Sequence, residues 1–276
     1  MKPLIKLGWL RALIFIPILF ILLSLIVGGV MSVVKIPRGI YLNIFLTFAQ
    51  SVAVMLAIFI SSKFIDRRSV QSFGFNFIWK DFLLGCLLGI ILITTGTILM
   101  AILGWSKFVF QGFDVLGLLK YFVFFVLVSI FEESLIRTYL LDNLMQSMNK
   151  YLALAITASI FSFLHFSNPA ADWFSTLELF LAGILLGLWY IHRGNIWFPI
   201  GLHLTWNYFQ GPVFGHEVSG NPIKESIFQQ IDIASQLESG GKFGMEGSWI
   251  GLGLTYLGCL WIEWYLRREK RVVILQ

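Results

Sequence analysis

The chain alternates between long apolar stretches and short polar connections. Eight stretches approach the ~20 residues that a helix needs to cross the hydrocarbon core of a bilayer. They are residues 12–34, 40–62, 82–104, 116–138, 151–166, 177–191, 197–214 and 249–266. Each is expected to be helical, because an open strand edge would leave backbone polar groups unpaired in lipid. The pattern predicts an all-α, polytopic membrane helix bundle with about eight transmembrane helices.

The composition excludes several other classes of protein. Of the 276 residues, 58% are hydrophobic and 13% are charged, whereas a soluble domain has about 45–50% apolar and about 25% charged residues. Polar side chains are too few to cover a globule in water, which excludes a cytosolic enzyme, a disordered protein and a nucleic-acid binder. Cys86 and Cys259 both lie in apolar stretches, so neither a disulfide framework nor a CxxC metal site is expected.

The distribution of lysine and arginine predicts the orientation in the membrane, because cytoplasmic connections carry an excess of basic residues. With the N-terminus in the cytoplasm, that side holds Lys2, Lys6, Arg11, Lys63, Arg67, Arg68, Lys80, Lys150, Arg193, Arg267, Arg268, Lys270 and Arg271. The opposite side holds Lys35, Arg38, Lys107, Lys224 and Lys242. An even number of spans places both termini in the cytoplasm, so a multi-pass protein of the cell membrane is expected.

The segment 215–247 is the only long polar stretch between two spans. It contains five acidic residues together with glycine, serine and glutamine. It is expected to form an exposed external connection with an amphipathic turn near 227–237. His216 opens this connection, and His192 lies in a turn; neither is assigned a role. No repeat period and no second domain is visible, so residues 1–276 are expected to form one membrane-embedded domain.

Charged side chains inside the fourth stretch are the first indication of a functional site. Glu132, Glu133 and Arg137 all lie there, and each charge costs ~2.5–3.5 kcal/mol at the centre of a bilayer. On a helix, Glu133 and Arg137 are i,i+4 neighbours in the favourable order, so a salt bridge that only neutralises the helix explains these two. Glu132 points about 100° away from that pair and has no local cation, so the same explanation does not cover it.

His165, His203 and Asn207 add polar groups to two further stretches. Taken singly, each has an ordinary explanation. His165, near the end of its stretch, suits an interfacial or capping residue, and His203 with Asn207 suits a hydrogen bond between helices worth ~0.6 kcal/mol. Taken with Glu132, they direct carboxylate, imidazole and amide groups from three helices into one bundle interior. Such a set is able to activate water, transfer a proton and stabilise an oxyanion.

Three short motifs follow one another in order on the fourth, fifth and seventh stretches. They are Glu-Glu-x-x-x-Arg (Glu132, Glu133 and Arg137), Phe-x-x-x-His (Phe161 and His165) and His-x-x-x-Asn (His203 and Asn207). In this order they resemble the CPBP (CAAX protease and bacteriocin-processing, or Abi) family of intramembrane proteases, which includes the type II CAAX prenyl endopeptidases. The resemblance covers roughly residues 116–214, the expected catalytic core. Thr138 departs from it, because family members usually carry glycine after the arginine.

The resemblance implies an intramembrane endopeptidase that hydrolyses a membrane-associated protein or peptide and has the lipid bilayer as its surroundings. It implies that Glu132 is the general base that activates water, with His165 as its partner in proton transfer. It implies that His203 and Asn207 stabilise the tetrahedral oxyanion. The positioning residues that it implies are Glu133 and Arg137.

The resemblance also raises the question of a metal cofactor. Glu132, His165 and His203 could supply the three protein ligands of an open catalytic zinc site. A metal-free mechanism, in which the same residues bind only water, is equally compatible with the sequence, and the soluble zinc-protease signature His-Glu-x-x-His is absent. Metal-free water activation is the preferred interpretation, and a divalent metal such as zinc stays open.

Two other functions also stay open. Intramembrane glutamate and histidine mark ion pathways as well as active sites, so a proton-coupled transporter is one alternative. No inverted repeat supports it. The other alternative is a non-catalytic membrane immunity or binding scaffold, because the family that the motifs resemble includes proteins linked to bacteriocin self-immunity.

Overall fold

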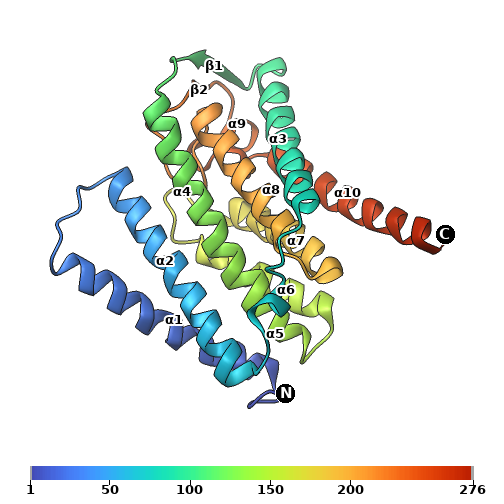
Figure 1. Cartoon of the computed structure of the whole chain (residues 1–276). Coiled ribbons are helices and arrows are strands. Elements are labelled where there is room, and N and C mark those ends of the chain that lie inside the picture. The colour runs from blue at the N-terminus through green and yellow to red at the C-terminus, as the bar shows by residue number, and fades with distance from the viewer. Residues whose placement is uncertain (1, 275–276) are drawn as a thin grey trace.

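The apolar stretches form helices that lie side by side in one bundle (Figure 1). The computed structural model describes residues 2–274. Its α-helices are α1 (Gly8–Met31), α2 (Ile40–Ser61), α3 (Trp79–Ile102), α4 (Val115–Glu133), α5 (Asp142–Met145), α6 (Lys150–Leu164), α7 (Trp173–Arg193), α8 (Trp197–Tyr208), α9 (Gln236–Ser239) and α10 (Trp249–Ile274). Turns of π- or 3-10-helix are η1 (Ser62–Asp66), η2 (Val70–Phe73), η3 (Ser134–Leu141), η4 (Phe209–Val213), η5 (Gly241–Phe243) and η6 (Met245–Gly247). The strands are β1 (Ser106–Phe110) and β2 (Phe228–Asp232). The predicted all-α fold class is confirmed.

Five helical segments within the described residues are long and apolar enough to cross a membrane, by length and composition. They are Gly8–Met31, Ile40–Asp66, Trp79–Ile102, Val115–Met145 and Trp173–Arg193. The stretches predicted at 151–166 and 197–214 are also helical. However, α6 has 15 residues and α8 has 12, fewer than the ~20 that a full crossing needs. These two helices therefore enter the bundle without the length of a complete span.

The helix α8 lies inside the bundle and continues directly into η4. Every residue from Phe198 to Asn207 is buried, and α8 packs most extensively against α3. Gly85 and Gly89 of α3 allow the two backbones to approach closely. A Cβ atom at Gly85 would lie only 2.1 Å from the carbonyl oxygen of Phe198. This packing fixes the position of the helix that carries two of the predicted site residues.

The fourth predicted stretch departs from a regular α-helix. The helix α4 ends at Glu133 and runs directly into the π-helix η3, which α5 then follows. A π-helix closes i→i+5 hydrogen bonds, is rare, and occurs frequently at functional sites. Hydrophobic periodicity predicted a helix to residue 138 and did not indicate the widened turns. The change of helix type begins immediately after the two adjacent glutamates.

The segment 215–247 is only partly exposed, whereas an exposed connection was expected. The strand β2 pairs antiparallel with β1, where an amphipathic turn was predicted near 227–237. Phe243 and Met245 are fully buried, and other residues of the segment line the cavity described below. Isolated apolar residues among glycines and acids have no periodicity, so the sequence pattern did not reveal that this segment folds over the bundle.

An ion pair fastens α1 to the rest of the bundle. Nη1 of Arg11 lies 2.8 Å from Oδ1 of Asp66, and the two side chains are 1% and 0% exposed. The hydroxyl of Tyr139 donates to the other oxygen of Asp66 at 2.8 Å. The sequence pattern placed Arg11 just before the first span, whereas α1 begins at Gly8 and contains it. The pair joins α1, η1 and η3 and so holds α1 beside the cavity.

Candidate active site

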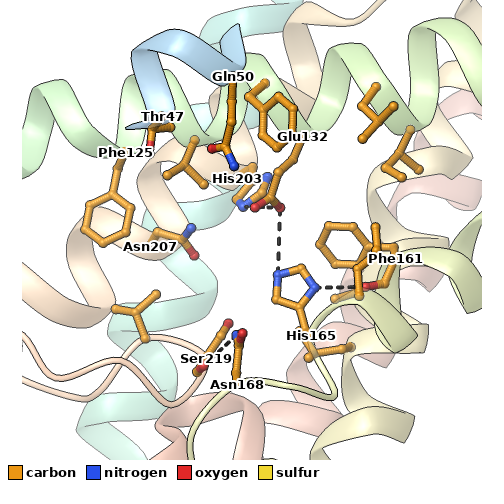
Figure 2. Close-up of a pocket in the computed structure, with 18 of the residues that line it drawn as sticks. Thr47, Gln50, Phe125, Glu132, Phe161, His165, Asn168, His203, Asn207 and Ser219 are labelled. Atoms are coloured by element: carbon orange, nitrogen blue, oxygen red, sulfur yellow. Dashed lines mark hydrogen bonds and ion pairs between the residues drawn. The ribbon is translucent and has the colours of Figure 1, made fainter. Parts of the chain in front are cut away.

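The four side chains predicted to carry the chemistry line one cavity. It has a volume of about 720 Å³ and lies between α1, α2, α4, α6, α7 and α8. Glu132 comes from α4, His165 is the residue that follows α6, and His203 with Asn207 comes from α8. Figure 2 shows the four side chains arranged around a common space. The structure thus brings together residues that are far apart in the sequence.

Glu132 lies at the centre of a small group of polar atoms. Its Oε2 is 3.8 Å from Nε2 of His165 and 3.9 Å from Nε2 of His203. This oxygen is buried and has no hydrogen-bond partner among the described residues, although the side chain is 22% exposed. Both distances exceed the range of a direct hydrogen bond and leave room for a bridging water. The geometry therefore suits an acid–base group that acts through water.

Both imidazoles are held with Nε2 toward Glu132. Nδ1 of His165 lies 2.8 Å from the carbonyl oxygen of Phe161, one helical turn earlier. Nδ1 of His203 lies 2.8 Å from Oε1 of Glu133. Because a carbonyl or carboxylate oxygen accepts, Nδ1 carries the proton in each ring, and Nε2 is left for the cavity. The contact between His203 and Glu133 was not predicted from the sequence.

Glu133 and Arg137 form a fully buried ion pair. Nε and Nη1 of Arg137 each lie 3.2 Å from a carboxylate oxygen of Glu133, and the side chains are 1% and 0% exposed. Arg137 also donates to the carbonyl oxygen of Gly183 on α7 at 3.3 Å, and its guanidinium lies over the ring of Phe161. Nη1 donates a charge-assisted hydrogen bond to Oε1, and Nε lies within ion-pair distance of Oε2, which gives strong and directional pairing. One carboxylate therefore binds the arginine and orients His203.

Asn207 follows His203 by one helical turn, with its amide directed into the cavity (Figure 2). A primary amide offers two N–H donors, which suits the stabilisation of an oxyanion. On the opposite wall, Nδ2 of Asn168 donates to the carbonyl oxygen of Ser219 at 2.9 Å. This bond ties the turn after α6 to the segment that folds over the bundle.

Sequence reasoning missed several polar residues in and beside the cavity. Asn43, Thr47 and Gln50 line it from α2. Their spacing of four and three places them on one face of a helix, so helical periodicity could have identified them. Glu178 is buried in α7 and accepts a hydrogen bond from Oγ1 of Thr255 at 2.6 Å. The rule that a charge inside an apolar stretch marks function could have identified it.

The two histidines that were given no role lie outside the set that lines the cavity. His216 is only 1% exposed, which contradicts its expected place in an exposed connection. Its Nε2 lies 2.9 Å from Oγ1 of Thr97, and burial lowers its pKa from 6.5 to about 4. His192 lies in the last turn of α7, 3.4 Å from Glu263.

The group around Glu132 has the donor chemistry of a metal site but not the arrangement. Glu132, His165 and His203 offer one oxygen and two nitrogens, and their Nδ1 contacts resemble those that orient metal-bound imidazoles. Among the side chains that the structure describes, however, no three from His, Cys, Asp or Glu gather closely enough to hold an ion. As placed, these residues do not fit a three-ligand metal site.

Comparison with known protein families covers the central part of the chain. Residues 114–209 match the family model described as type II CAAX prenyl endopeptidase Rce1-like. This segment, about a third of the 276 residues, contains all four side chains grouped in the cavity. No curated protein matches the chain. The family match confirms the resemblance that the three motifs indicated.

Proposed function

We propose that the protein is an intramembrane endopeptidase, starting from the match of residues 114–209 to the Rce1-like family model of type II CAAX prenyl endopeptidases. One observation carries the proposal. A carboxylate and two imidazoles from three helices converge in a cavity within a bundle of apolar helices. The proposed substrate is a membrane-associated protein or peptide, and the proposed location is the cell membrane, with several spans and both termini in the cytoplasm.

In the proposed reaction, Glu132 activates a water molecule. A separation of 3.8 Å between its Oε2 and Nε2 of His165 allows one water to hydrogen-bond both groups. The water oxygen forms a bond to the carbonyl carbon of the substrate while its proton passes to the carboxylate. The electron pair of the carbonyl double bond moves onto the carbonyl oxygen, which becomes an oxyanion.

The residues on α8 stabilise that oxyanion in this mechanism. Asn207 donates through its amide N–H groups. Nε2 of His203 donates when the ring carries a second proton, because its Nδ1–H is already directed to Glu133. One preorganised donor contributes about 10²–10³ in rate. Collapse of the tetrahedral intermediate breaks the C–N bond, and the proton on the carboxylate passes, with His165 as partner, to the leaving amine.

The walls of the cavity support an apolar segment as the substrate. Ile16, Leu19 and Phe20 line it from α1, and Phe124 and Val128 line it from α4. Cavities of this kind bind mainly through apolar burial, and a few polar groups fix the orientation of the ligand. A peptide segment that partitions into the membrane would lie against these walls and present its scissile bond to the polar end.

The proposal includes activation of water without a metal. The three side chains that could act as ligands are the same ones that would bind the water. Their present arrangement does not form a three-ligand set, so no step of the proposed reaction passes through an ion.

The test of the proposed function compares new protein N-termini in membranes from cells that express different variants. Mass spectrometry of labelled N-termini should detect cleavage products with the unsubstituted protein that disappear with Glu132→Gln and with His165→Gln. Glu225→Gln is the matched control, because Glu225 lies outside the cavity. Identical sets of N-termini in all four samples, at equal amounts of protein, would refute the proposal.

A further inference from the structure

The cavity contains a second carboxylate, separate from the group around Glu132. Glu246 lies in η6, is 3% exposed and lines the cavity. Its Oε1 accepts hydrogen bonds from Nε1 of Trp206 at 3.3 Å and from Oγ of Ser219 at 3.4 Å. Its Oε2 accepts from Nε2 of Gln210 at 2.5 Å. These donors are neutral, so they orient the carboxylate without cancelling its charge.

Two unpartnered polar atoms lie near Glu246, on residues that do not line the cavity. Glu178 is 0% exposed and interacts electrostatically with Glu246. Oε2 of Glu178 and Oε1 of Gln210 are both buried, and neither has a hydrogen-bond partner among the described residues. In the same part of the chain, no lysine, arginine or histidine forms an ion pair with either acid. The region therefore lacks a cation.

A buried carboxylate without a cation is energetically costly. Burial raises the pKa of Glu246 above its ordinary value, and hydrogen bonds from Gln210 and Trp206 only partly oppose the shift. A cation that entered through the cavity would remove this cost, because opposite charges attract strongly where water is scarce. Ionisable residues within membrane proteins normally pair, and they mark the paths of substrates.

Two hydrogen bonds connect Glu246 to residues near the reacting groups in the chain. Trp206, which donates to Glu246, directly precedes Asn207 on α8. Ser219, which also donates to Glu246, accepts through its carbonyl oxygen from Asn168 in the turn that follows α6. Glu246 is thus linked to both walls between which the scissile bond would lie.

We propose that Glu246 is a cation-binding subsite that takes a lysine or arginine side chain located a few residues from the scissile bond. The inference rests on the proposed protease function and deepens it by naming a class of substrate. A basic side chain suits the cavity, because its apolar stem lies along apolar walls while its charged end reaches the carboxylate. The same carboxylate repels a free C-terminal carboxylate bound at this position.

A binding experiment tests the subsite without relying on catalysis. The probe is n-hexylguanidinium, added to the purified full-length protein in detergent, with the midpoint of thermal unfolding as the readout. The compound n-hexanol has the same stem without charge, and sodium chloride supplies a bare cation. The guanidinium should raise the midpoint more than either control. The difference should vanish in Glu246→Gln and persist in Glu225→Gln, the same change in an acid of the same connection outside the cavity.

A second variant keeps the binding test decisive if Glu246→Gln does not fold. Glu246→Asp retains the charge but withdraws it by one methylene, so it should retain only part of the guanidinium effect. An equal effect in Glu246→Asp and the unsubstituted protein overturns the proposal. So does the absence of any guanidinium effect, and so does a sodium effect as large as the guanidinium effect.

A cleavage experiment links the subsite to the substrate. A mixture of random-sequence peptides is incubated with the protein in lipid nanodiscs, and the cleaved bonds are identified by mass spectrometry. Lysine or arginine near the cleaved bond should be enriched by about tenfold, a modest effect for a buried charge pair, and Glu246→Gln should abolish the enrichment. Cleavage without this preference overturns the subsite and leaves the protease function intact. Guanidinium binding without any cleavage refutes the protease function and leaves the subsite intact.

Discussion

Replacing Glu133 by glutamine tests whether this residue stabilises the fold, whereas the chemistry is assigned to the neighbouring Glu132. The carboxylate of Glu133 is fully buried and lies 3.2 Å from two nitrogens of Arg137. At an effective dielectric constant of 20, a pair of charges at this distance attracts by about 5 kcal/mol. Removing one partner of a buried pair costs about 3–5 kcal/mol, because the other charge stays buried without compensation. We therefore expect Glu133→Gln to lower the free energy of unfolding by about 3 kcal/mol or more.

The matched control is the same substitution one residue earlier. Oε2 of Glu132 has no hydrogen-bond partner within the described residues, and the side chain is partly exposed. Glu132→Gln should therefore change the free energy of unfolding by less than about 1 kcal/mol, in the range of substitutions that break no buried contact, while it abolishes cleavage. Reversible unfolding in mixed micelles, followed by tryptophan fluorescence, measures both variants under identical conditions.

A double variant checks the cause of the expected loss. Glu133→Gln combined with Arg137→Met removes the uncompensated charge, so it should recover part of the stability that Glu133→Gln alone loses. The reasoning is refuted if Glu133→Gln unfolds at the same denaturant concentration as Glu132→Gln. It is also refuted if the double variant is less stable than Glu133→Gln alone, because the buried cation would then not be the source of the loss.

Two further outcomes are expected. Treatment with a strong chelator should leave cleavage unchanged, and elemental analysis should find no stoichiometric metal. The reason is that Glu132, His165 and His203 do not form a ligand set as placed. A loss of activity that zinc restores would contradict this expectation. His216 should make the fold sensitive to acid. Its pKa is about 4 in the folded protein against 6.5 ordinarily, so the unfolded chain binds more protons between these values and stability falls as the pH drops from 6.5 to 4, by about 3 kcal/mol. The unfolding midpoint of His216→Gln should lack this part of the pH dependence.

The helices were largely predictable because each long apolar stretch must form hydrogen bonds between its own backbone N–H and C=O groups. All eight stretches are helical in the structure. The structure departs from the prediction where tertiary packing determines the local conformation. Hydrophobic periodicity cannot distinguish an α-turn from the π-turn that follows Glu133. It also could not show that Arg11 pairs with Asp66, a residue far along the chain, or that Phe243 and Met245 fill the end of the bundle.

The candidate site was partly predictable because charged groups are conspicuous in an apolar stretch. Glu132 stood out because Arg137 was already paired with Glu133, and the structure brings two histidines from elsewhere in the chain near Glu132. The contact of His203 with Glu133 depends on how deeply α8 is inserted beside α4, which no local pattern records. Glu246 was interpreted as an ordinary loop acid, because its burial depends on the folding of the whole connection.

The enclosed position of α8 has a consequence for the dependence of this protein on its lipids. Protein surrounds α8 from Phe198 to Asn207, whereas the segment Val115–Met145 is long enough to reach both faces of a membrane. A bilayer of different acyl-chain length changes the tilt of the long helices that it surrounds. It does not act directly on α8, which is enclosed by protein. Thickness would therefore shift Glu132 relative to His203, and turnover would follow the chain length of the surrounding phospholipids.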